Sequence, residues 1–369
     1  MIQNKMMNMT TEPNVQNERN QKIIDVVLQK EKQLGPGTVD LIGIYGSFAT
    51  GDLYPGSDLD LLILINDDRG WKLGTGFILE DQQIGYDIYC TDRDSLRQDA
   101  QYTHPHISKL MDSRIVYAAN KEAEEQLENL RRQVRKRLAE PFGEADYANA
   151  ERALQDAEKC FAEAFAADDL AGIRRQAGGV IYYVENAIAL LNKTYYRKGV
   201  RRRYDDLSAM RRRPDNLCEL IDQVVSAGSA DQIREALTRL ISAVIRTFRD
   251  AKKDISPRKE APSAEKLSGT YEEMFSNWRN KMYLAAATGD RHLAFSSLES
   301  LDAMLADISS EVNIGTYNAI AAYDPDDLQK TAEAFDAILA EYENEYPTAG
   351  LKVRRYPDVD AFAEDYLNA

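Results

Sequence analysis

The chain has 369 residues, a length that fits about two or three domains of ordinary size. Its 61 acidic and 46 basic residues give a formal charge of −15, which argues against binding to a long nucleic acid, because such binding depends on neutralising many phosphates. No apolar run approaches the roughly 18 residues of a membrane span, and three widely spaced cysteines without a CxxC pair indicate neither a disulfide framework nor a zinc site. We therefore expect a cytoplasmic protein without a membrane partner.

The beginning of the chain changes character near residue 21. Residues 1–20 are rich in Asn, Gln, Met and Thr and lack an apolar core, so we expect a disordered tail and not a secretory signal. Residues 21–34 carry apolar side chains at helical spacing and end at Gly35-Pro36-Gly37, which predicts a helix that covers a sheet.

Residues 41–65 read as strand, turn and strand. The apolar residues 41–45 precede Gly46 and Ser47, and a polar stretch then leads to Asp58-Leu59-Asp60 and a continuous apolar run to Ile65. Side chains alternate along a strand, so Asp58 and Asp60 would stand side by side while Leu59 faces the opposite layer. Two carboxylates this close repel each other unless a cation lies between them, and oxygen ligands select a hard cation such as magnesium.

The Gly-Ser pair before this turn has the chemistry of a phosphate site. Gly46 lacks a Cβ, so a phosphate can approach its backbone, and Ser47 offers a hydroxyl and a main-chain N–H where the chain turns into a short helix. We place Ser57, next to Asp58, in the same predicted nucleotide-binding set. The alternative is a solvated strand start with an ordinary turn, but the apolar runs on both sides favour a site.

This Gly-Ser, spacer, Asp-x-Asp arrangement resembles the nucleotidyltransferase superfamily of DNA polymerase beta, and most closely its small bacterial members that adenylylate antibiotics such as aminoglycosides. The resemblance covers roughly residues 39–117. It implies a short mixed sheet with three carboxylates, two Mg²⁺ ions, and transfer of a nucleoside monophosphate from a nucleoside triphosphate to an acceptor hydroxyl.

The family pattern also requires a third carboxylate on a neighbouring strand. Residues 84–90 alternate suitably, and we choose Asp87 over Glu80 and Asp81 as the residue that strand pairing brings beside Asp58 and Asp60. One metal would then be held by all three aspartates and activate the acceptor hydroxyl, and a second, held by Asp58 and Asp60, would neutralise the pyrophosphate. Gly74-Thr75-Gly76 is expected to be a hairpin turn.

The remaining chain predicts one more strand and then helices. Residues 91–101 are expected to be helical and residues 113–117 to form the last strand, and from about residue 144 the apolar periodicity is almost purely helical. We therefore expect an α/β (α+β) nucleotidyltransferase domain with a short mixed sheet, followed by a large all-α region. The expected boundaries are a tail at 1–20, the nucleotidyltransferase domain at 21–140, a helical domain at 141–255, a proline-containing linker at 256–265 and a second helical segment at 266–369.

Three features of the helical region and of the segment before it have competing interpretations. Residues 193–213 hold nine basic side chains, which suit phosphate binding, but we favour a connector whose charges pair with the acidic remainder. Glu185 is a candidate general base by analogy, because the helical domain of the antibiotic-modifying relatives commonly supplies one. His104 and His106 lack further regular ligands and are read as loop residues.

The expected function is magnesium-dependent transfer of a nucleoside monophosphate to a hydroxyl of a small molecule, with release of pyrophosphate. ATP is the expected donor by family habit alone, and another nucleoside triphosphate stays open. The partners are thus the nucleotide and a small acceptor, with no long nucleic acid; a homodimer stays open, because relatives with a split cleft sometimes complete it across a dimer. The alternatives are modification of a protein or RNA end, as in toxin–antitoxin systems, and a non-catalytic nucleotide-sensing module.

Overall fold

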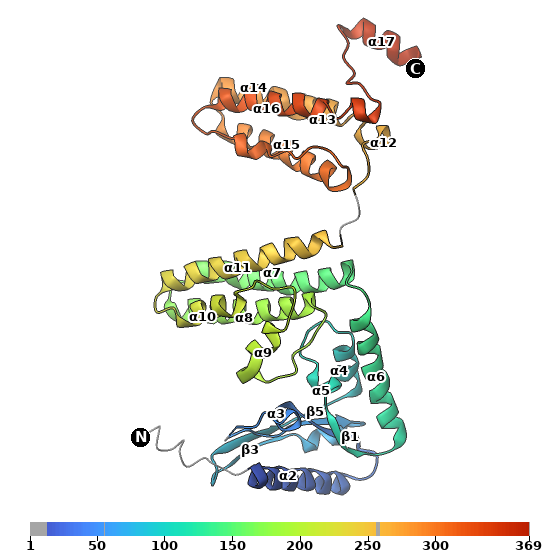
Figure 1. The fold of residues 1–369 in the computed structure, drawn as a ribbon, viewed down its shortest axis with the longest axis vertical. Helices are drawn as coiled ribbons and strands as arrows, with labels where there is room; N and C mark the ends of the chain where they lie inside the picture. The colour runs from blue at the N-terminus through green and yellow to red at the C-terminus, as the bar shows by residue number, and fades with distance from the viewer. Residues whose placement is uncertain (1–12, 55, 256–258, 369) are drawn as a thin grey trace. The chain divides into compact units, whose positions relative to one another are not determined.

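The chain folds as two units with separate hydrophobic cores. The computed structural model describes residues 13–54, 56–255 and 259–368, and the units are Met1–Ile255 and Ser256–Ala369. Unit 1 contains an α/β part (residues 13–139) and a helical part (residues 144–255), and unit 2 is helical (Figure 1). The predicted fold class, a small mixed sheet followed by helices, is confirmed.

A mixed sheet forms the centre of the α/β part. The described strands are β1 (Val39–Tyr45), β2 (Asp60–Ile65), β3 (Thr75–Leu79), β4 (Ile84–Ile88), β5 (Cys90–Thr91) and β6 (Arg114–Ala118). The order in the sheet is β5-β2-β1-β6, with β1 antiparallel to both of its neighbours and β2 parallel to β5. Strands β3 and β4 form a separate antiparallel hairpin.

The two faces of this sheet belong to different cores. On β2, Leu62 and Leu64 point into a core that continues through the helical part, whereas Ile63 and Ile65 point into a core covered by the first helix. This alternation follows from the extended backbone, in which neighbouring side chains project to opposite sides. The face that carries Leu62 and Leu64 is therefore also the face of Asp60.

Helices surround the sheet. In the α/β part they are α2 (Pro13–Leu34), α3 (Gly46–Thr50), η1 (Asp68–Leu73), α4 (Arg93–Ala100), α5 (Ser108–Met111) and α6 (Lys121–Ala139). Helix α4 begins where the Asp92 side chain accepts a hydrogen bond from the Ser95 N–H, a common way to satisfy a free amide at a helix start.

Two local expectations were wrong. Helix α2 begins at Pro13, so residues 13–20 are helical and not part of a disordered tail, and the side chains of Arg19 and Asn20 are buried; residues 1–12 lie outside the described residues. Gly74 ends the short helix η1 and Thr75 begins β3. The hairpin turn lies at residues 80–83 instead, where Gln83 adopts a φ of 54°.

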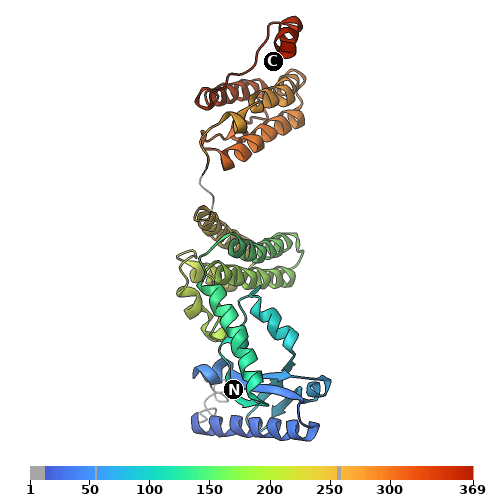
Figure 2. The ribbon, with the colours of Figure 1, turned by 90° about the vertical axis from the view of Figure 1, so that its right-hand side faces the viewer.

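The helical part of unit 1 is a bundle whose core is continuous with that of the sheet through the helices α4, α5 and α6. Its elements are α7 (Glu144–Ala166), α8 (Leu170–Leu191), η2 (Val200–Arg202), α9 (Arg203–Ser208), α10 (Leu217–Ser226) and α11 (Ala230–Lys253). Fully buried residues such as Val180, Val184 and Val244 belong to the same core as Leu41 of β1. Figures 1 and 2 show α8 and α9 on the side of the sheet opposite to α2.

Unit 2 has a core of its own. Its elements are α12 (Ala264–Leu267), α13 (Thr270–Met274), η3 (Phe275–Arg279), α14 (Asn280–Thr288), α15 (Arg291–Glu311), η4 (Ala319–Ala322), α16 (Leu328–Glu343), η5 (Pro347–Ala349) and α17 (Val359–Asn368). Phe335 and Tyr342 of α16 are completely buried. In contrast, α17 has no buried residue.

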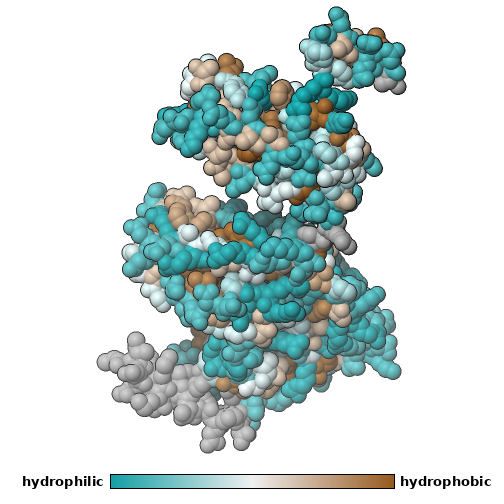
Figure 3. All heavy atoms as spheres, turned by 45° about the horizontal axis from the view of Figure 1, so that its top comes forward, coloured by the Kyte–Doolittle hydropathy of each residue, from teal (hydrophilic) through white to brown (hydrophobic). Residues whose placement is uncertain are grey.

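The face drawn in Figure 3 is largely hydrophilic with smaller hydrophobic areas, in agreement with a mean hydropathy of −0.50. Among the helices of the described ranges, none combines the length and apolar character needed to cross a membrane.

The separate core of unit 2 leads to a stability prediction. Leu339 is 2% exposed and Leu284 is 55% exposed, and both lie on helices of unit 2. We expect Leu339→Ala to lower the free energy of unfolding of unit 2 by about 2–5 kcal/mol, because it leaves a cavity in the core. The control Leu284→Ala should change it by no more than about 0.5 kcal/mol. Calorimetric melting of both variants checks this, and equal effects would contradict it.

Candidate functional site

The turn after β1 and the start of β2 lie against each other. Tyr45, the last residue of β1, pairs with Asp60, the first residue of β2. Gly46 begins α3 with a φ of 67°, and a Cβ placed on it would lie 1.8 Å from Oδ2 of Asp60. The Asp60 carboxylate therefore rests on the bare backbone of Gly46, an approach that only glycine permits. The Gly-Ser pair and the second aspartate of Asp-x-Asp are thus brought together.

The Asp60 carboxyl group has an unusual electrostatic environment. Burial raises its pKa to about 6, the nearby Asp58 carboxylate adds to the rise, and a hydrogen bond from the Ser47 backbone opposes it. A negative charge at Asp60 thus lacks enough positive partners in the protein itself. A pair of crowded carboxylates of this kind fits a hard divalent cation, which removes their mutual repulsion.

Asp87 faces the same side of the protein as Asp60, but it lies outside the part of the chain that pairs with β2. Its strand, β4, pairs with β3, and the parallel pairing with β2 begins only at Ile63 and Cys90. Counting this register back by three residues brings Asp87 opposite Asp60. Tyr86 and Ile88 point into the core under α2, so Asp87, between them, faces the other way, as Asp60 does.

The three aspartates do not form a closed ligand set. Within residues 13–54, 56–255 and 259–368, no group of three carboxylate, imidazole or thiol side chains is close enough together to hold a metal ion. The Asp58 and Asp60 charges do influence each other. The structure therefore provides two of the expected ligands side by side and places the third on the matching face.

Tyr45 is a member of the site that the sequence analysis missed. Burial raises the pKa of its phenol, and the charges of Asp60, Tyr89 and Asp58 raise it further. The phenol is thus a neutral hydroxyl beside the carboxylates. Strand alternation in β1 could have indicated it, because Tyr45 follows Leu41 and Gly43 on one face.

Ser57 supports the turn that leads into Asp58. It is 1% exposed, and its Oγ accepts a hydrogen bond of 2.9 Å from the Tyr54 N–H. The buried Arg19 donates a hydrogen bond of 3.1 Å to the Ser57 carbonyl. No sequence signal pointed to Arg19, which lies in the segment that composition assigned to a tail.

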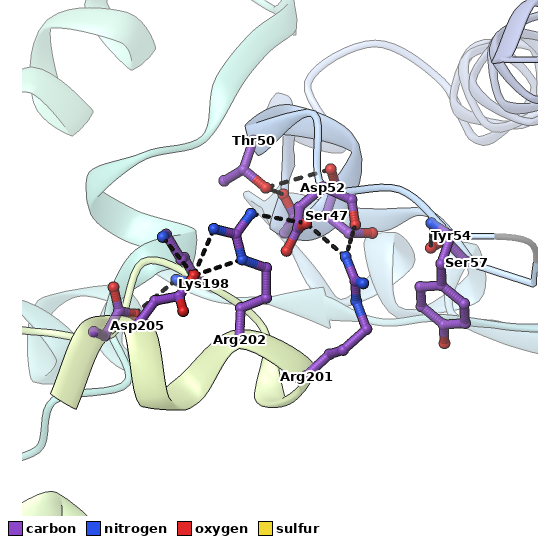
Figure 4. A network of polar contacts seen from close by, with 11 residues as sticks. Ser47, Thr50, Asp52, Tyr54, Ser57, Lys198, Arg201, Arg202 and Asp205 are labelled. Atoms are coloured by element: carbon purple, nitrogen blue, oxygen red, sulfur yellow. Dashed lines mark hydrogen bonds and ion pairs between the residues drawn. The ribbon is translucent and has the colours of Figure 1, made fainter. Parts of the chain in front are cut away.

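The basic segment 193–213 reaches back to the end of α3. Arg201 Nη2 lies 2.6 Å from Asp52 Oδ1, and Arg202 Nη1 lies 3.2 Å from the same atom (Figure 4). The Asp52 N–H in turn donates to the carbonyl of Ser47. These contacts agree with the favoured interpretation, in which the basic residues pair with acidic ones, and they tie the helical part to the Gly-Ser turn.

Glu185 on α8 is held by the same basic segment. Its side chain is 13% exposed and lies 3.7 Å from Nη1 of Arg203, whose guanidinium stacks 3.8 Å from the centre of the Tyr196 ring. Burial raises the pKa of Glu185, and the Arg203 charge opposes the rise. The ion pair that the structure shows for Glu185 is thus with Arg203 and not with a group of the aspartate site.

The two loop histidines are separately engaged. His104 Nε2 lies 3.4 Å from Asp99 Oδ1, and His106 Nε2 lies 2.8 Å from Oδ1 of Asn186 and stacks on the Tyr182 ring. This matches their interpretation as loop residues.

The glycine at the start of α3 leads to a second prediction. Gly46 and Gly51 both have a positive φ, 67° and 71°, but only at Gly46 would a Cβ meet another atom within 4 Å. We expect Gly51→Ala to cost about 1–2 kcal/mol of unfolding free energy from backbone strain alone. Gly46→Ala should cost clearly more, because Asp60 must also move. Urea unfolding measures both variants. Equal losses of unfolding free energy would show that the contact with Asp60 does not add to the cost of a side chain at Gly46.

Two regions of the chain match known protein families. Residues 21–140 match the family described as nucleotidyltransferase domain, and residues 156–252 match the family described as KNTase C-terminal domain. A solved structure of a nucleotidyltransferase-like protein from Exiguobacterium sibiricum 255-15 is 12% identical, with 75% of this chain and 86% of that chain covered and a TM-score of 0.31. No curated protein matches. With a Gly-Ser turn and an Asp-x-Asp strand in the first matched region, the chain is a nucleotidyltransferase that combines a nucleotidyltransferase domain with a KNTase-type C-terminal domain.

Proposed function

We propose that this enzyme transfers a nucleoside monophosphate, AMP from ATP, to a hydroxyl of a small molecule in the cytoplasm and releases pyrophosphate. The observation that carries the proposal is the contact of the Asp60 carboxylate with the bare backbone of Gly46, beside Ser47 and Asp58. This contact joins a phosphate-binding turn to a site for a hard cation. ATP is taken from the family resemblance.

The residues of the turn have separate roles in this proposal. Gly46 leaves the backbone open to the phosphates and Ser47 offers its N–H and hydroxyl to them, while Ser57 holds the turn that positions Asp58. Asp58 and Asp60 would hold Mg²⁺, with Asp87 as the third ligand. Bound Mg²⁺ lowers the pKa of the attacking hydroxyl and neutralises charge on the phosphates.

The acceptor is proposed to bind between the sheet and the helical part. The sheet face that carries Asp60 continues into the core of the helical part, so an acceptor bound there can contact both. A chain with a formal charge of −15 favours a small or cationic acceptor over a long nucleic acid. Glu185, partly desolvated, is the proposed general base from the helical part.

The carboxylates provide the direct test of this function. We expect Asp58→Asn and Asp60→Asn to lower kcat/KM by about a thousandfold, since loss of metal charge stabilisation costs several kcal/mol and each 1.36 kcal/mol is a factor of ten. Asp87→Asn should lower it by at least about a hundredfold on the same scale. The assay is pyrophosphate release with each nucleoside triphosphate against aminoglycosides, lincosamides, small metabolites and RNA, with and without Mg²⁺.

The control for these variants is Asp81→Asn. Asp81 is an exposed carboxylate at the hairpin turn beyond β3, so its loss should leave the rate unchanged. If Asp87→Asn behaves like Asp81→Asn, Asp87 is not a ligand. If Asp58→Asn and Asp60→Asn keep full activity, the proposed function is wrong.

Glu185 leads to a pH prediction. A general base acts only when it is deprotonated, and burial raises the pKa of Glu185 above the usual 4.5. We therefore expect kcat/KM to fall as the pH drops through a value higher than that of an ordinary glutamate. Glu185→Gln should lower kcat by about a hundredfold or more and remove this acidic limb. Glu235→Gln, on the exposed side of α11, is the control, and an unchanged profile in Glu185→Gln would assign the base elsewhere.

A further inference from the structure

A groove lies on the side of the α/β part that faces away from Asp58 and Asp60. It is a cavity of about 600 Å³ between α2 and the β3–β4 hairpin. Its walls are mainly apolar and include Ile23 and Val26 of α2 and Phe77 and Leu79 of β3. Val26 is 63% exposed, so it extends the apolar lining of the groove to the surface.

The charged residues around this groove are all cations. Arg19, Lys22, Lys30 and Lys72 line it, and none of the lining residues that the structure describes is acidic. Lys22, Lys30 and Lys72 are exposed, and none of the three forms an ion pair with another residue that the structure describes. In a chain with a formal charge of −15, such a cluster of unpaired lysines around an apolar groove suits an acidic, amphipathic occupant.

Helix α17 has the complementary character. Val359, Phe362 and Tyr366 recur at three- and four-residue spacing, and Leu367 lies on the flank of this stripe; the four side chains are 77%, 43%, 70% and 80% exposed, so they form an apolar stripe without a cover. Asp360, Glu364 and Asp365 lie beside this stripe.

The segment that carries α17 separates from its bundle before the helix begins. Arg354 and Arg355 still contact Glu272 and Glu343 of the bundle. Beyond them, the contacts that the structure shows for residues 356–368 stay within this segment, as for the Tyr356 ring on Phe362. Figures 1 and 2 show α17 standing off α13–α16.

We propose that α17 of a second copy of this chain docks in the groove along α2. An amphipathic helix with anchors at this spacing is a common ligand of apolar grooves. Its stripe from Val359 to Leu367 is about 12 Å long, and the α2 wall from Arg19 to Lys30 is about 16 Å long, at 1.5 Å per residue. The acidic residues of α17 then lie opposite the lysines. Val26, Lys22 and Lys30, which carry this proposal, have no role in the catalytic one, so the two proposals can be tested separately.

The test is sedimentation velocity of the full-length protein over a range of concentrations. We expect the wild-type chain to self-associate, and Val26→Glu and Leu367→Asp each to weaken association by about tenfold or more, because each replaces an apolar side chain of the proposed interface with a charged one. Both residues are exposed, so neither change disturbs the fold. Val225→Glu, at a valine that is 64% exposed on α10, is the matched control and should associate as the wild type does.

A charge exchange identifies the two surfaces as partners. Lys22→Glu with Lys30→Glu should weaken association, as should Glu364→Lys with Asp365→Lys, and a mixture of the two doubly substituted proteins should restore it. A peptide of residues 355–369 should compete. A monomeric wild type, an association that none of these variants changes, or competition by a peptide of residues 1–12 instead would each overturn the proposal.

Discussion

The alternation of side chains along β2 is the constraint on which the site depends. Leu61, Ile63 and Ile65 fill the core under α2, and the residues between them must therefore face the other core, which continues into the helical part. Asp58 and Asp60 continue this second register beyond the last apolar residue. A shift of the β2 register by one residue would bury both carboxylates among aliphatic side chains. The two cores therefore determine the fold and also the face on which Asp58 and Asp60 project.

Apolar burial, more than ion pairing, joins the helical part to the α/β part. Burying a side chain of their shared core, such as Leu110 or Leu191, contributes about 1.5–3 kcal/mol, whereas a solvent-exposed ion pair contributes at most about 1 kcal/mol. The Arg201 side chain is 56% exposed in its pair with Asp52, so that contact sets position more than stability. The shared core keeps the helical part in place, and the arginines define where its basic segment meets α3.

The sequence predicts what local periodicity and short spacing control. The strands at residues 39–45 and 60–65 and the short helix after Gly46 follow from apolar runs and one glycine, and the structure has all three. Contacts between distant residues leave no such signature: the pair of Asp52 with Arg201 spans 149 residues, and Arg19 reaches Ser57 from a polar segment. The hairpin turn was misplaced because Gly74 and Gly76 carry the usual turn signal, whereas Gln83 adopts the left-handed conformation instead.

The parallel ladder between β2 and β5 is only two residue pairs long. Because it is so short, no backbone pairing that the structure describes ties Asp87 to β2. In the described sheet, backbone pairing joins Ile63 to Cys90 and Leu64 to Thr91, so Asp87, three residues earlier, rides on a hairpin whose other edge is β3. The side chains on either side of Asp87, Tyr86 and Ile88, are anchored in the core under α2. Side-chain packing, and not a backbone rung to β2, therefore sets how far Asp87 lies from Asp60.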